Sequence, residues 1–217
     1  MDGLLIDSET VVREGVIRAA EAMGHDFPPQ LYLETIGRSE ADYLQIISEH
    51  FGPDFPMADF QLVERREIAR LFEAGVTLKA GVVELLEALE AMGLPMAVAT
   101  SSSRRSVETH LGFHGLYERF EAVVAREDVT RHKPNPDPFL EAARLLNVEP
   151  QLCLALEDSH NGVRAAHAAG MMTVMVPDLL DPTEEMRGLC VHIVDSLHHV
   201  RELVGRQGTG PHRPAKG

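Results

Sequence analysis

The first third of the chain, residues 8–74, carries apolar side chains at helical spacing. Ile17 and Ala20 lie three positions apart and Tyr43 and Ile47 lie four apart, as on one face of a helix. No strand-like alternation interrupts this pattern. Breaks rich in Gly and Pro, at Gly24, 27–29 and 52–56, divide the segment into about four helices. The pattern therefore predicts an all-helical domain over residues 8–75.

The remainder of the chain alternates short apolar runs with helical patterns. Such alternation predicts right-handed crossovers and a parallel sheet covered by helices on both faces. The fold class is therefore α/β, a doubly wound parallel sheet with an inserted helical domain. We expect the sheet domain to comprise residues 1–7 and 76–204. The expected strands are 94–100, 120–125, 152–156, 171–176 and a short one near Val191. One expected helix ends near Gly93 and another begins near Arg104. Further helices are expected over 136–146, over 159–169 and after Ser196.

The tail, residues 205–217, is rich in Gly, Pro and basic residues and has no apolar periodicity. A segment of this composition cannot bury enough apolar surface to offset the entropy of ordering. We therefore expect the tail to be disordered.

The composition restricts the classes of partner. With 217 residues and 44% hydrophobic content, the chain can bury a substantial core. A net charge of -14 opposes encounter with nucleic acid or an anionic membrane. A small anionic substrate remains compatible with this charge, because a metal ion and a lysine reverse the potential locally.

Cysteine usage and hydropathy bear on the cellular compartment. Cys153 and Cys190 lie far apart in apolar surroundings, which favours reduced thiols over the alternative of a single disulfide. No apolar run approaches the roughly 20 residues that span a bilayer, and the first residues differ from a secretory signal. We therefore expect a cytoplasmic protein.

Polar residues follow the expected strands at four places, namely Asp2-Gly3, 100–102, Lys133-Pro134 and 157–159. Ligands of open parallel sheets bind beyond the carboxyl ends of the strands. Singly, these places have structural explanations: a helix N-cap, a surface lysine or a solvated acidic pair. For Ser159 the N-cap role is the favoured one. Together they supply carboxylates, hydroxyls at a helix N-terminus and a lysine, which suit magnesium and a phosphoryl group.

Four segments, MDGLLIDSE, VATSSS, KPNPDPF and EDSHNGVRAAHAAGM, resemble in order and spacing the motifs of the haloacid dehalogenase superfamily. The resemblance covers nearly the whole chain apart from the tail. It is closest to the branch with a helical cap after the first motif, which includes β-phosphoglucomutases and phosphoglycolate phosphatases. It implies a Rossmann-like core, Mg²⁺ as cofactor, and hydrolysis of a small phosphomonoester, such as a sugar phosphate, through an aspartyl-phosphate.

The resemblance assigns roles to the strand-end residues. Thr100 would donate its hydroxyl, and Ser101 its backbone N–H, to the phosphoryl group, where a helix N-terminus favours an anion. Lys133 would neutralise charge on the nucleophile and on the transferring group. Asp158 would bind magnesium directly, and Glu157 would bind it directly or through water.

The first motif of the family is Asp-x-Asp-Gly, in which the first aspartate attacks phosphorus. Asp2 matches the second aspartate, which would protonate the leaving oxygen, activate water and offer its backbone carbonyl to the metal. Met1 takes the x position, so the nucleophile would directly precede it. That motif ends the central strand, whose loss would leave neighbouring strand edges unpaired. We therefore expect a start codon assigned too late, or a shortened chain, rather than an evolved inactive protein.

Two alternatives to a phosphatase stay open. If Met1 is the true start, the chain would be a noncatalytic protein that binds a phosphorylated metabolite. A β-phosphoglucomutase-like mutase is the other alternative, but the family's mutases carry a histidine and a cap arginine where this chain has Val12 and Glu40. A glutamate would repel the second phosphate of a bisphosphate intermediate.

The cap loop around Arg38, Ser39 and Glu40 would select the substrate by resemblance to related enzymes. Arg38 would grip an anionic leaving group, with a surface salt bridge as the alternative. The expected partner is a small phosphorylated metabolite, without nucleic acid or membrane, and the expected state is a monomer or weak dimer.

Overall fold

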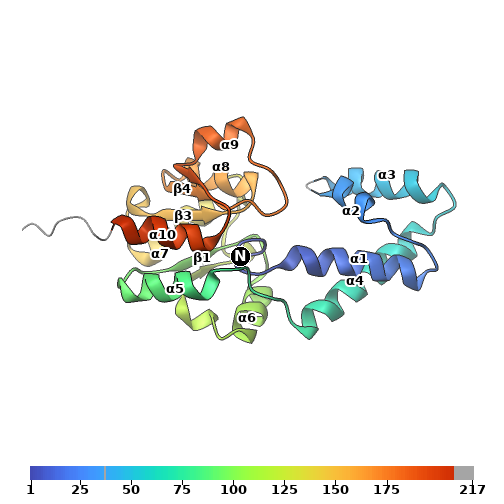
Figure 1. The fold of residues 1–217 in the computed structure, drawn as a ribbon, viewed down its shortest axis with the longest axis horizontal. Helices are drawn as coiled ribbons and strands as arrows, with labels where there is room; N and C mark the ends of the chain where they lie inside the picture. Colours follow the sequence, from blue (N-terminus) through green and yellow to red (C-terminus); the bar gives the residue numbers. More distant parts are fainter. Residues whose placement is uncertain (37, 208–217) are drawn as a thin grey trace, which may run out of the picture. The chain divides into compact units, whose positions relative to one another are not determined.

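The computed structural model describes residues 1–36 and 38–207. It has helices and parallel strands, as the predicted α/β class requires (Figure 1). The chain divides into two compact units. One contains Asp2 and residues 6–77, and the other contains Met1, residues 3–5 and the chain from Leu78 onward.

The helical unit contains the four predicted helices: α1 (Ser8–Ala22), α2 (Pro29–Thr35), α3 (Glu40–Phe51) and α4 (Met57–Ala74). Helices α1 and α4 lie side by side (Figure 1). Gly15 makes this close packing possible, since a Cβ there would lie 2.4 Å from Cγ1 of Ile68. Val16, Ile47 and Phe60 are almost fully buried in the core of this unit. Burial of such apolar side chains contributes about 1.5–3 kcal/mol each.

The described part of the α/β unit contains five strands in two parallel sheets. Strand β1 (Ala97–Ala99) pairs with β2 (Ala122–Val124). The second sheet has the order β3 (Leu154–Glu157), β4 (Met172–Met175) and β5 (His192–Ile193). The helices of this unit are α5 (Val82–Ala91), α6 (Arg104–Phe113), α7 (Asp137–Leu146), α8 (His160–Ala168), α9 (Glu184–Leu189) and α10 (Leu197–Gln207), with 3-10 turns η1 (Tyr117–Arg119), η2 (Arg126–Asp128) and η3 (Pro150–Leu152).

Helices cover both sheets. Helix α7 packs against β1 and β2, α8 packs against β3 and β4, and α5 packs against α10. Among the described residues, β1 and β3 each pair with a strand on one side only. The single sheet that the sequence predicts is thus divided in two, with β1 and β3 at sheet edges.

The structure corrects the predicted start of the C-terminal tail and adds a helix that was not predicted. The disordered tail was expected from residue 205, but α10 continues to Gln207 because its apolar helical pattern extends through Leu203 and Val204. Residues 208–217 lie outside the described part of the chain. The short helix α9 was not predicted at all, although Thr183 caps it and Glu184 and Glu185 occupy its first turn.

Cys153 and Cys190 are free and partly exposed, as expected for reduced thiols. Across the part of the chain that the structure describes, every helix is too short or too polar to cross a bilayer.

Candidate active site

Thr100 is the site residue that directly follows the carboxyl end of β1. Its backbone N–H donates to the Val124 carbonyl at 2.9 Å, which extends the β1–β2 ladder by one residue. Its side chain is buried, and Oγ1 accepts the Ser102 N–H at 3.1 Å. A hydroxyl that accepts in this way still has its own proton to donate. Ser103 is the N-cap of α6, so Ser101 lies in the turn between β1 and that helix.

Lys133 connects the ends of the two sheets. Its Nζ donates to the Ala99 carbonyl at 3.0 Å and to a carboxylate oxygen of Glu157. The lysine side chain is 10% exposed and that of Glu157 is 6% exposed. The alternative of an ordinary surface lysine is therefore wrong. Because Ala99 ends β1 and Glu157 ends β3, one ammonium group lies at the carboxyl ends of both edge strands.

Glu157 is fixed from its other side by the start of α8. Ser159 Oγ donates to Glu157 Oε2 at 3.2 Å and accepts the Gly162 N–H at 3.1 Å. Ser159 is thus the N-cap of α8, as predicted. A Cβ at Gly162 would lie 2.0 Å from Oε2 of Glu157, so only glycine leaves room for this carboxylate. The observed contacts make Glu157 a partner of Lys133, and its role toward a metal stays a prediction.

Asp158 follows β3 and faces the turn at Gly3. The carbonyl of Met1 accepts the Leu5 N–H at 2.8 Å and closes the turn in which Asp2 and Gly3 lie. Gly3 has a φ of 70°, in the left-handed region that favours glycine. A Cβ on it would lie 2.2 Å from Asp158 Oδ2. Burial, and then the adjacent Glu157 carboxylate, raise the pKa of Asp158 to about 6.

Two further charged residues at this edge were missed by the sequence analysis. Lys79 Nζ donates to Asp178 Oδ1 at 2.5 Å, and Asp178 Oδ2 is buried without a hydrogen-bond partner among residues 1–36 and 38–207. Asp178 follows the predicted strand 171–176, so the strand-end rule used elsewhere would have found it. Nothing in the sequence indicates its pairing with Lys79.

The acidic residues of this edge fit magnesium better than a transition metal. No group of three or more His, Cys, Asp or Glu side chains within the described ranges is arranged to hold an ion. Mg²⁺ keeps several waters and takes one or two carboxylates together with substrate phosphate oxygens. The half-buried Asp158 carboxylate, near the unpartnered Oδ2 of Asp178, meets this requirement of one or two carboxylates.

The predicted specificity residues lie at the start of α3 in the helical unit. Ser39 caps this helix, with its Oγ accepting the Asp42 N–H at 3.2 Å. Arg38 is exposed, and its Nε donates to the carbonyl of Glu34 at 3.3 Å. Glu40 is exposed at the first position of the helix. Gly37, in the same loop, lies outside the described residues, and the role in specificity stays a prediction.

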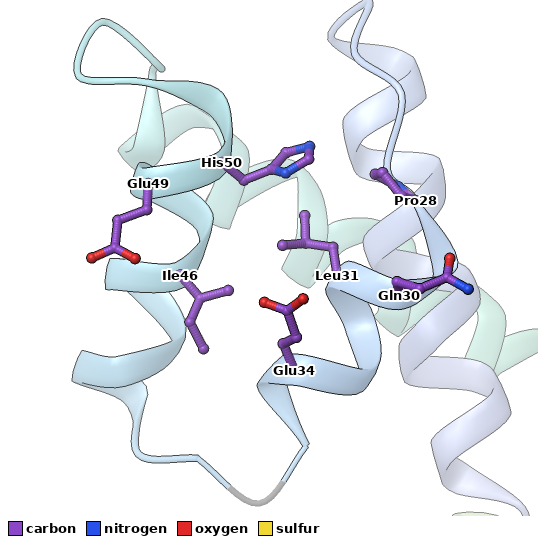
Figure 2. Close-up of a pocket in the computed structure, with 7 residues that line it drawn as sticks. All are labelled: Pro28, Gln30, Leu31, Glu34, Ile46, Glu49 and His50. Atoms are coloured by element: carbon purple, nitrogen blue, oxygen red, sulfur yellow. The ribbon is translucent and has the colours of Figure 1, made fainter.

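A groove of about 330 Å³ lies within the helical unit, where side chains of α2 and α3 face one another (Figure 2). It contains no lysine or arginine, and its carboxylates would repel a phosphate ester. None of the predicted site residues lines it. The strand ends therefore remain the better candidate for the active site. The lining residues are Pro28, Gln30, Leu31, Glu34, Ile46, Glu49 and His50.

Comparison with known proteins decides the family. Residues 1–176 match the family of haloacid dehalogenase-like hydrolases. The chain belongs to this family. This match confirms the predicted family, and the relatives and solved structures confirm the α/β fold and the enzyme class of a haloacid dehalogenase-like phosphatase.

Relatives of this haloacid dehalogenase-like hydrolase include a protein named "Phosphorylated carbohydrates phosphatase" from Thermotoga maritima. It is 31% identical over 171 residues, which cover 79% of this chain and 79% of the relative. A solved structure of a hydrolase of the same family from Deinococcus radiodurans, with bound phosphate and sodium, has a TM-score of 0.84 at 25% identity and covers 96% of this chain and 93% of its own. A CbbY variant from Rhodobacter sphaeroides, in complex with xylulose-(1,5)-bisphosphate, has a TM-score of 0.66 at 27% identity, with 91% and 92% covered.

Proposed function

We propose that the protein is a Mg²⁺-dependent phosphatase that hydrolyses a small phosphomonoester, of the sugar phosphate class, through an aspartyl-phosphate. The observation that carries this proposal is the buried ammonium group of Lys133 at the ends of β1 and β3. It contacts the carboxylate of Glu157, which ends β3, and the carbonyl of Ala99, the residue before Thr100. A cation fixed at such a position can neutralise the charge that develops on a transferring phosphoryl group.

Different residues of the proposed site bind the phosphoryl group and Mg²⁺. Thr100 donates its hydroxyl and Ser101 its backbone N–H to the phosphoryl oxygens, and Lys133 neutralises their charge. Asp158, with Glu157 and the backbone carbonyl of Asp2, holds Mg²⁺. When bound, Mg²⁺ withdraws charge from the phosphoryl group and orients it.

Asp2 handles the protons in this proposal. Its carboxyl group first protonates the leaving oxygen and then takes a proton from the attacking water. The nucleophile is an aspartate that directly precedes Met1, at the end of a strand between β1 and β3. Two features support that placement: the edges of β1 and β3 are unpaired among the described strands, and Lys133 lies at the carboxyl ends of both.

The substrate class rests on the relatives and on the cap loop. One relative carries the name of a phosphatase of phosphorylated carbohydrates, and another was solved with a sugar bisphosphate. Arg38, Ser39 and Glu40 are proposed to select among such substrates. A phosphatase is favoured over a mutase because Glu40 adds a negative charge where a mutase needs a cation.

Release of inorganic phosphate from a panel of sugar phosphates, in the presence of Mg²⁺, tests the proposal. We expect release by a chain that carries the preceding strand and aspartate, and we expect this release to be lost in its Asp158→Ala variant. It should be kept in the Asp181→Asn variant, which removes the same charge from an exposed position. A mutase would isomerise its substrate with little release, and a noncatalytic binder would do neither. Release that persists unchanged in Asp158→Ala would contradict the proposed site.

A further inference from the structure

Asp178 lies at the same edge of the sheet as Asp158. Strand β4 ends at Met175 beside the end of β3, where the Val176 N–H donates to the Glu157 carbonyl at 2.7 Å. The carboxyl ends of parallel neighbours meet at one edge, so Asp178 and Asp158 leave their strands in the same region.

The orientation of the Asp178 carboxylate is set by Lys79. The ion pair uses Oδ1, and the aspartate side chain is 12% exposed. Oδ2 is buried and has no hydrogen-bond partner among the described residues. That oxygen lies 3.2 Å from the position of a Cβ at Gly3, and Asp158 Oδ2 lies 2.2 Å from the same position. By binding Oδ1, Lys79 therefore orients Oδ2 of Asp178 toward Gly3, which Asp158 Oδ2 also faces.

This arrangement is costly without a cation. A buried oxygen of a charged group that lacks a partner has lost its hydration without a compensating hydrogen bond. Two carboxylates that face the same point also repel one another. Lys79 engages Oδ1 of Asp178, and Lys133 engages Glu157, so neither amine satisfies Asp178 Oδ2.

We infer that Asp178, oriented by Lys79, is a further carboxylate of the divalent-cation site and holds Mg²⁺ through water. Asp178 is a positioning residue, since Asp158 remains the direct ligand. The inference rests on the proposed function, which places Mg²⁺ at Asp158. Outer partners of a metal typically contribute 10–100-fold to its affinity. Only glycine at position 3 leaves room for both carboxylates.

Calorimetric titration of the protein with Mg²⁺ tests the inference without depending on turnover. We expect Asp178→Asn, which can still accept from Lys79, to weaken Mg²⁺ binding about 10-fold or more. Asp181→Asn is the matched control, because it removes the same charge from an exposed position of the same loop. We expect its Mg²⁺ affinity to stay within about twofold of that of the unaltered protein.

Thermal unfolding in EDTA separates a metal role from a purely structural one. If Asp178 serves the metal, Asp178→Asn unfolds at an unchanged or higher temperature in EDTA and gains less stability from Mg²⁺ than the unaltered protein does. Equal Mg²⁺ affinity in Asp178→Asn and the unaltered protein would overturn the inference alone, provided that Asp158→Asn loses binding. Unchanged binding in Asp158→Asn, or none in the unaltered protein, would overturn the metal site of the proposed function as well.

Discussion

At the scale of single residues, the carboxylates of the site depend on glycines that leave them room. Gly162 contacts the Glu157 carboxylate so closely that no side chain fits, and Glu157 in turn holds Lys133. The sequence indicated Lys133, Glu157 and Asp158 because each follows an apolar run. The same rule would have indicated Asp178, but its pairing with Lys79 joins segments 99 positions apart and leaves no local pattern.

The Gly162→Ala variant tests this dependence. The added methyl group would displace Glu157 and break its contact with Lys133, and overpacking of this kind costs about 1–3 kcal/mol. We expect a lower free energy of unfolding in urea and, in a chain that carries the aspartate before Met1, slower phosphate release. Gly112→Ala in α6 is the control, because a Cβ there meets no atom within 4 Å. It should be neutral or stabilising by up to about 1 kcal/mol, and an equal loss in both variants would contradict the steric explanation.

At the scale of elements, the spacing of apolar residues predicted most helices. The bounds of the strands and their pairing were known only from the structure. The expected strand 94–100 is shorter in the structure, where β1 covers Ala97–Ala99. Pro95 has no N–H to offer to a ladder, so pairing begins after it. The division into two sheets follows from long-range pairing, which apolar runs alone do not encode. The short helix α9 has too few residues for a periodic signal and was found only from the structure.

Helices α3 and α4 are joined by a hydrogen bond in which the Tyr43 hydroxyl donates to Glu64 Oε1 at 2.8 Å. Burial raises the pKa of Glu64, although the hydrogen bond from Tyr43 opposes the shift. An acid whose pKa is raised on folding contributes stability below its ordinary value of 4.5, and this is lost as pH rises through the folded value.

We therefore expect Glu64→Gln, which lacks this titration, to gain thermal stability relative to the unaltered protein as pH rises from about 4 to 7. Thermal unfolding followed by circular dichroism at several pH values measures the difference. Tyr43→Phe removes the opposing hydrogen bond, so it should lose more stability over the same range than the unaltered protein. A stability difference between Glu64→Gln and the unaltered protein that does not change with pH would refute this explanation.

At the scale of the whole molecule, the proposed site lies at one edge that the two sheets share. Thr100 follows β1, Glu157 and Asp158 end and follow β3, and Lys133 bonds to both strand ends. The family and its α/β fold were predictable because four motifs stand in order along the chain. The substrate was not predictable, because selection depends on side chains of the helical unit that no motif specifies.

The central proposal is that an aspartate, at the first position of the family motif and directly before Met1, attacks phosphorus beside Lys133. The most direct measurement compares phosphate release, with Mg²⁺ present, by two chains that carry about six strand-forming residues and then either Asp or Asn before Met1. Loss of a nucleophile lowers turnover by about 10³-fold or more, so the Asp chain should release phosphate and the Asn chain should be nearly inactive. Equal release by the two chains would contradict the claim.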